Sequence, residues 1–198
     1  MQVMRILFVC AVISFAWGSS FGRGDPSDHQ RRRLVNEEYK LSVEVPAGAT
    51  TCEVTSPGGG HRHGFSILLS LGRCQTPGPV RYVMLVGDYN ATFDATPERY
   101  LRMLCPHGRP LALASEPHGL SFPSRPSAVC KCDESKGWVD VFVVAGGGQT
   151  PKGFGVPPSV PYIYYKAILH TRVSRLASDL EAFRRILATV RIGDQQVP

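Results

Sequence analysis

The sequence has little charge, few acidic residues and no internal repeat. Of its 198 residues, 19% are charged, against roughly 25% in an average soluble domain, and 16 acidic residues stand against 22 basic ones. Beyond the N-terminus, no apolar run reaches the roughly 18 residues that a membrane-spanning helix needs. Hydrophobic residues make up 43% of the chain, which excludes a disordered or collagen-like protein and indicates a folded domain of ordinary size.

Catalytic signatures are also missing. The chain contains no Gly-x-Ser-x-Gly turn, no His-Glu-x-x-His helix and no local cysteine-protease motif. The glycine run 146–148 lacks the Gly-Lys-Ser/Thr ending of a phosphate-binding loop. The aspartates Asp88, Asp94, Asp133 and Asp140 show no spacing typical of a catalytic pair. We therefore lean against an enzyme, and we expect no cofactor.

The first 18 residues have the pattern of a secretory signal peptide. Arg5 supplies a short basic start, residues 6–17 are almost entirely apolar, and Ala16 and Gly18 place small residues at the cleavage positions. We expect cleavage after Gly18 and export to the periplasm or the extracellular space. An oxidising compartment allows disulfides to persist.

Removal of residues 1–18 takes away one positive charge and Cys10. The formal net charge of the precursor is +6, so the mature domain remains basic. Its basic residues are scattered, apart from the run Arg31-Arg32-Arg33, and export argues against nucleic acid as a ligand. We expect a protein partner with an acidic surface, and no membrane span after signal removal. The oligomeric state is left open.

The mature chain divides into three predicted regions. Residues 19–38 are polar and charged, which predicts a flexible lead-in. Residues 39–192 form a single predicted domain, and residues 193–198 are a tail. Alternating or short apolar runs predict strands at 39–45, 51–54, 65–71, 80–89, 137–144 and 162–171. The proline-rich segment 106–136 reads as a long connection, and 146–153 as a mobile loop.

Two helices are predicted. Thr96 and Pro97 suit the start of a short helix that ends near Cys105. Ser178 and Glu181 have the spacing of a capping box, and apolar residues then recur at steps of three and four up to residue 190. The fold class is therefore α+β: a single domain in which one short and one C-terminal helix pack on one face of an antiparallel sheet, stabilised by disulfides.

Five cysteines remain in the mature chain: Cys52, Cys74, Cys105, Cys130 and Cys132. Two bridges and one free thiol follow from this odd number, and fifteen arrangements are possible. We favour Cys52 with Cys74, and Cys105 with either Cys130 or Cys132. We expect the odd thiol within Cys130-Lys131-Cys132, whose two thiols are expected to point to opposite faces of a strand. That arrangement disfavours a shared metal ion.

Two glycine-rich segments, 58–64 and 146–153, are the candidate partner-binding loops. Their candidate contact residues are Gly60, His61, Arg62, His63, Gly147, Gln149 and Lys152. His61 and His63 also offer two imidazoles on one side of an extended segment, and with a third ligand they would bind zinc or copper. A metal-binding or metal-dependent hydrolytic protein is therefore the alternative function. Asn90-Ala91-Thr92 is a glycosylation sequon if the host is eukaryotic.

The two ends of the predicted domain resemble PsbP-like domains. The resemblance lies in the strand 39–45 that runs into Pro46-Ala47-Gly48, and in the helical segment 179–192 that follows a strand. It implies a small exported α+β domain that acts by binding another protein. Our prediction is an exported, non-catalytic protein-binding module, in its most specific form a periplasmic immunity-type inhibitor of a toxin or enzyme.

Overall fold

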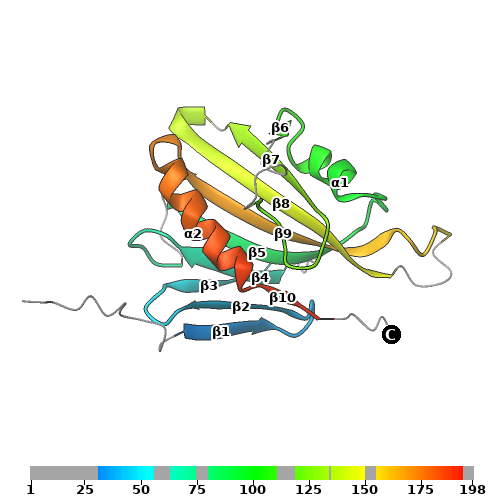
Figure 1. Cartoon of the computed structure of the whole chain (residues 1–198), viewed down its shortest axis with the longest axis horizontal. Coiled ribbons are helices and arrows are strands. Elements are labelled where there is room, and N and C mark those ends of the chain that lie inside the picture. Colours follow the sequence, from blue (N-terminus) through cyan, green and yellow to red (C-terminus); the bar gives the residue numbers. More distant parts are fainter. Residues whose placement is uncertain are drawn as a thin grey trace, which may run out of the picture.

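The computed structural model describes residues 31–55, 63–74, 80–110, 119–133, 135–149 and 155–193. Within these residues the chain forms a seven-stranded sheet of order β3-β4-β5-β9-β8-β7-β6, a three-stranded sheet and two α-helices (Figure 1). All strand pairings in the large sheet are antiparallel. Its strands are β3 (Thr51–Val54), β4 (His63–Leu68), β5 (Tyr82–Tyr89), β6 (Arg109–Pro110), β7 (Ser127–Asp133), β8 (Trp138–Gln149) and β9 (Pro161–Arg172).

The smaller sheet has the order β1-β2-β10, and its first strand corrects the prediction of a flexible lead-in for residues 31–36 of 19–38. β1 (Arg31–Asn36) pairs along its whole length with β2 (Leu41–Pro46), and β10 (Arg191–Ile192) pairs with the start of β2. Two arginines of β1 form hydrogen bonds within the domain: Arg32 Nη2 donates to Thr51 Oγ1 at 2.6 Å, and Arg33 Nη2 donates to Ser42 Oγ at 3.0 Å. The predicted signal peptide, 1–18, and residues 19–30 lie outside the described residues, as do residues 194–198 of the predicted tail.

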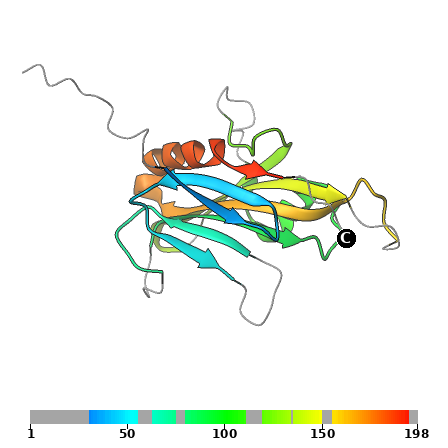
Figure 2. The ribbon, with the colours of Figure 1, turned by 90° about the horizontal axis from the view of Figure 1, so that it is seen from below.

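Strand alternation gives the large sheet two different faces. Val143 and Tyr165 belong to the main core, which also holds Phe183 of α2 (Leu176–Ala188) and the apolar side chains of β2. Their neighbours Val144 and Tyr164 point to the opposite side. There they form a second core with side chains of α1 (Pro97–Leu104). Figure 2 shows α2, in orange to red, on one side of the sheet.

The placement of both helices on one face is therefore corrected, because each helix covers its own face. The broader prediction is confirmed: the chain is an α+β protein built mainly from antiparallel strands, with two helices and two disulfides. Among the described residues, no helix is both long and apolar enough to cross a membrane.

Two strands extend into segments where the sequence predicted irregular structure. β7 lies inside the proline-rich connection and pairs with β8 from Ser127↔Ala145 to Asp133↔Val139. β8 continues through the glycines as far as Gln149, so the predicted mobile loop is wrong for 146–149. Glycine and proline lower strand propensity, but pairing with a long central partner overrides that local preference.

The predicted start of α1 is confirmed, and the predicted start of α2 is wrong. Thr96 caps α1 as predicted, and its side chain accepts a hydrogen bond from the Arg99 amide. The capping box at Ser178 is wrong, because α2 begins at Leu176 after the short 3₁₀ turn η3 (Val173–Arg175). The Ser178 hydroxyl instead donates to the Arg175 carbonyl inside the first turn.

A carboxylate in the first turn of α2 ties the helix to the large sheet. Asp179 is 6% exposed. It accepts hydrogen bonds from Arg81 Nη1 at 2.7 Å, just before β5, and from the Thr171 hydroxyl on β9. Arg81 Nη2 also donates to the Leu69 carbonyl at 2.9 Å. One largely buried ion pair thus joins α2 to β9 and to the chain next to the ends of β4 and β5.

We expect Asp179→Ala to lower the free energy of unfolding by about 3 kcal/mol, because the arginine would lose its buried partner. Urea denaturation measures this change. Glu181→Ala on the same helix is the matched control: the Glu181 side chain is 58% exposed, and we expect a loss of at most about 0.5 kcal/mol. Equal losses in the two variants would contradict the anchoring role of Asp179.

Candidate functional site

The cysteines are arranged largely as predicted. Cys52 bonds to Cys74, and Cys105 bonds to Cys132, which resolves the alternative that the sequence left open. Cys130 is free of a disulfide and buried. Burial raises the pKa of its thiol above the ordinary value. The odd thiol therefore lies in the Cys130-Lys131-Cys132 segment, as the sequence predicts.

The expected direction of these two thiols is wrong. Residues two apart on a strand point to the same face, so Cys130 and Cys132 both face the end of α1. Their sulfurs lie within 4.8 Å of one another and of the Cys105 sulfur. In the described part of the chain, this is the one group of three side chains with the spacing of metal ligands, and His63 is not in it.

Of the seven predicted partner-binding residues, the structure describes His63, Gly147 and Gln149. Gly60, His61, Arg62 and Lys152 lie outside the described residues. His63 begins β4, where its Nδ1 contacts the Glu38 carboxylate and its ring meets the Tyr39 ring edge-on at 6.3 Å. Burial, and then the charge of Glu38, raises the pKa of the Tyr39 hydroxyl. His63, one of the two histidines predicted as metal ligands, is therefore in contact with the Glu38 carboxylate.

Gly147 and Gln149 lie in β8 and line a cavity of about 600 Å³ with Arg125. Gly147 is required there, because a Cβ atom at this position would lie 2.4 Å from the Tyr165 ring. Arg125 stacks over the same ring at 5.9 Å and donates to the Gly146 carbonyl. The glycines therefore allow close packing inside the domain, and the predicted role as a mobile contact loop is not supported for 146–149.

A buried lysine lies beneath α1 and was missed from the sequence. Lys166 on β9 is 1% exposed, and its ammonium donates to the Asp88 carboxylate and, at 3.2 Å, to the Tyr100 hydroxyl. The Tyr100 hydroxyl donates to Asp88 at 3.1 Å. Three elements thus share one charged network, which holds α1 against the sheet.

A stacked column on the same face was also missed. The His170 ring lies between Trp138, at 4.6 Å, and Tyr82, at 5.0 Å, and its Nδ1 is 2.7 Å from Asp140 Oδ1. The guanidinium of Arg172 covers the outer side of Trp138 at 4.1 Å. A carboxylate orients the imidazole, as in catalytic dyads, but aromatic rings cover both of its faces. Packing is therefore the role that the geometry supports.

The Asn90 sequon is part of the fold. Asn90 is 3% exposed, and its amide donates to the carbonyls of Asp94 and Pro161 at 2.9 and 2.8 Å. A glycan on this nitrogen would remove a donor and would need space that the buried site does not offer. We therefore read Asn90 as a structural residue.

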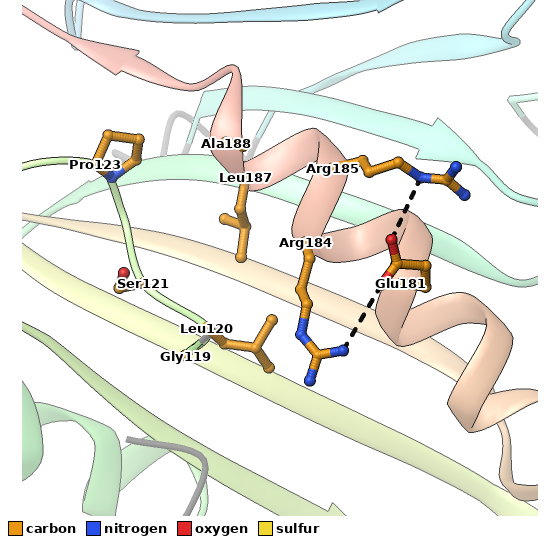
Figure 3. Close-up of a pocket in the computed structure, with 9 residues that line it drawn as sticks. All are labelled: Gly119, Leu120, Ser121, Pro123, Glu181, Arg184, Arg185, Leu187 and Ala188. Carbon is orange, nitrogen blue, oxygen red and sulfur yellow. Dashed lines mark ion pairs between the residues drawn. The ribbon is translucent and has the colours of Figure 1, made fainter. Parts of the chain in front are cut away.

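Two of the cavities among the described residues flank α2 and are lined by charged side chains. One, of about 700 Å³, lies between residues 119–123 and α2 (Figure 3). Its floor is apolar, with Leu120 and Leu187, and Arg184 extends into it while Arg185 points to the other side of the helix. Both arginines pair with Glu181, at 3.8 and 4.0 Å. We call this cavity the first α2 groove.

The second α2 groove, of about 450 Å³, lies between α2 and the sheet residues of β1, β2 and β4. Arg185 lines it from the helix, and Arg31 lines it from β1. The Arg185 side chain is 74% exposed, and the Arg31 side chain is 50% exposed and lies 3.8 Å from Glu44. The fold thus brings the arginine run of β1 beside the arginines of α2, which the sequence could not indicate.

Comparisons with known proteins identify no relative: no family model matches the chain, and no curated protein matches it. The resemblance to PsbP-like domains stays a prediction.

The Lys166 network yields a prediction about stability. We expect Asp88→Asn to cost about 3–5 kcal/mol of unfolding free energy, because it leaves a buried ammonium without its carboxylate. Adding Lys166→Met should recover much of that loss, since the buried charge disappears. Chemical denaturation of both single variants and the double variant gives the coupling. A double variant with the summed loss of the two singles would contradict the pairing.

Proposed function

We propose that the protein is an exported, non-catalytic module that binds an acidic segment of a partner protein along the two α2 grooves. The observation that carries the proposal is the convergence of Arg31, Arg184 and Arg185, from β1 and α2, on grooves with apolar floors. Arginine and buried apolar anchors are the side chains that dominate protein interfaces.

The state of these arginines supports an acidic partner. Their pairs with Glu181 and Glu44 are 3.8 to 4.0 Å long, and these carboxylates are half-exposed or more. Such surface pairs contribute little stability, so the carboxylates of a partner compete with them at low cost. Guanidinium groups also bind carboxylates through two parallel hydrogen bonds, which fixes the relative orientation of the two groups and adds affinity.

The rest of the molecule suits a binding module rather than an enzyme. The two disulfides and the signal peptide pattern are compatible with an exported protein. A stapled scaffold presents its surface with little loss of conformational entropy on binding. An immunity-type inhibitor of an exported toxin or enzyme is the most specific form of the proposal. In this form, the basic grooves would cover an acidic active-site region.

The metal alternative, based on His61 and His63, remains a prediction with less support. Its one described residue, His63, is held by Glu38, and His61 lies outside the described residues.

The binding proposal predicts a partner whose affinity depends on the α2 arginines. Immobilised wild-type protein should retain a stoichiometric partner from the exported fraction of its source cells. For that purified partner, Arg184→Glu/Arg185→Glu should raise the Kd at least ~10-fold, because each reversed charge faces an acidic group. Biolayer interferometry measures the Kd, and circular dichroism confirms that the variant is folded.

Arg102→Glu is the matched control, because Arg102 is an exposed arginine on α1, over the opposite face of the sheet. It should leave the Kd unchanged. Equal affinity of the wild type and the α2 variant would contradict the proposed surface. The absence of any stoichiometric partner would contradict the binding function itself.

A further inference from the structure

Three sulfurs meet where the end of α1 touches β7. Cys105 caps α1 and is bonded to Cys132 on β7. The Cys130 thiol, two residues earlier on the same face of β7, lies 3.0 Å from Cys105 Sγ. Cys105 and Cys130 are 4% and 5% exposed, and Cys132 is half-buried. A thiol that forms no disulfide is thus held in contact with a sulfur of the Cys105–Cys132 disulfide.

We propose that this cluster is a thiol–disulfide exchange site in which Cys105 forms either of two bridges, to Cys132 or to Cys130. In the exchange, the Cys130 thiolate attacks Cys105 Sγ. The Cys105–Cys130 bond forms as the Cys105–Cys132 bond breaks, and Cys132 leaves as a thiolate. Cys132 then takes up the proton that Cys130 released, so the step needs neither oxidant nor reductant.

Two features of the surrounding chain are compatible with either bridge. The two alternatives close chain segments of nearly equal length, with sequence separations of 25 and 27 residues, so their effect on the unfolded chain is the same. Gly108 covers the sulfurs: a Cβ atom at this position would lie 2.0 Å from Cys105 Sγ and 2.1 Å from Cys130 Sγ. Either bridge keeps α1 attached to β7.

The two isomers differ in which thiol remains. With the observed bridge, the remaining thiol is the buried Cys130, and burial raises its pKa, so only a small fraction of it is the attacking thiolate and the exchange is slow. After exchange it is the half-buried Cys132, which is more accessible to a small thiol or to an exported dithiol. The exchange would therefore move a reactive thiol from the interior toward the surface without unfolding the domain.

The test is the Cys132→Ser variant, in which we expect a Cys105–Cys130 bridge. Thiols are blocked with N-ethylmaleimide in acid, and the unreduced protein is then digested and mapped by mass spectrometry. Trypsin cleaves after Lys131, so Cys130 and Cys132 fall in separate peptides. Cys130→Ser is the matched control and should retain the Cys105–Cys132 bridge. A Cys132→Ser protein with both Cys105 and Cys130 labelled after unfolding would overturn the proposal.

The wild-type protein gives a second measurement that does not depend on folding of a variant. Folded protein is incubated with N-ethylmaleimide for increasing times and then mapped in the same way. We expect label to accumulate on Cys132, together with the Cys105–Cys130 bridge, because alkylation traps the minor isomer. If Cys132 stays unlabelled and bridged to Cys105 at all times, the exchange does not occur.

Discussion

The pairing of β8 with β9 is the constraint on which the rest of the structure depends. These two twelve-residue strands run from Trp138↔Arg172 to Gln149↔Pro161 at the middle of the large sheet. Because side chains alternate along a strand, one register assigns every residue of both strands to a face. Val143 and Ala167 thereby join the core under α2, and Val144 and Lys166 lie under α1. A slip by one residue would exchange the two faces.

The two faces of the large sheet carry different side-chain chemistry. The α1 face carries the Lys166 network, the stacked His170 and the three sulfurs. Lys166 and His170 are paired there with carboxylates of the same domain. The α2 face carries Arg31, Arg184 and Arg185 along the two α2 grooves, and the side chains of Arg31 and Arg185 are at least half-exposed. These basic groups beside apolar side chains are the reason that we place partner binding there.

Part of this arrangement followed from local patterns. The alternating strands, the Thr96 cap and the Cys52–Cys74 bridge depend on neighbours close in sequence, and all three were predictable. The capping box at Ser178 failed because η3 sets the helix start two residues earlier. The arginines of 31–33 read as solvated because nothing in their own segment shows that β2 pairs with them. The same limitation concealed Lys166, whose partners come from β5 and α1.

The sequence by itself determined the fold class, the odd thiol and its segment, because composition, alternation and cysteine count need no knowledge of distant contacts. Only the tertiary structure decided which cysteine pairs with Cys105, that each helix covers its own face, and that Arg31 and Arg185 share a groove. The physical reason is the same in each case. These features arise from contacts between segments far apart in the chain, and strand register together with close packing determines which segments meet.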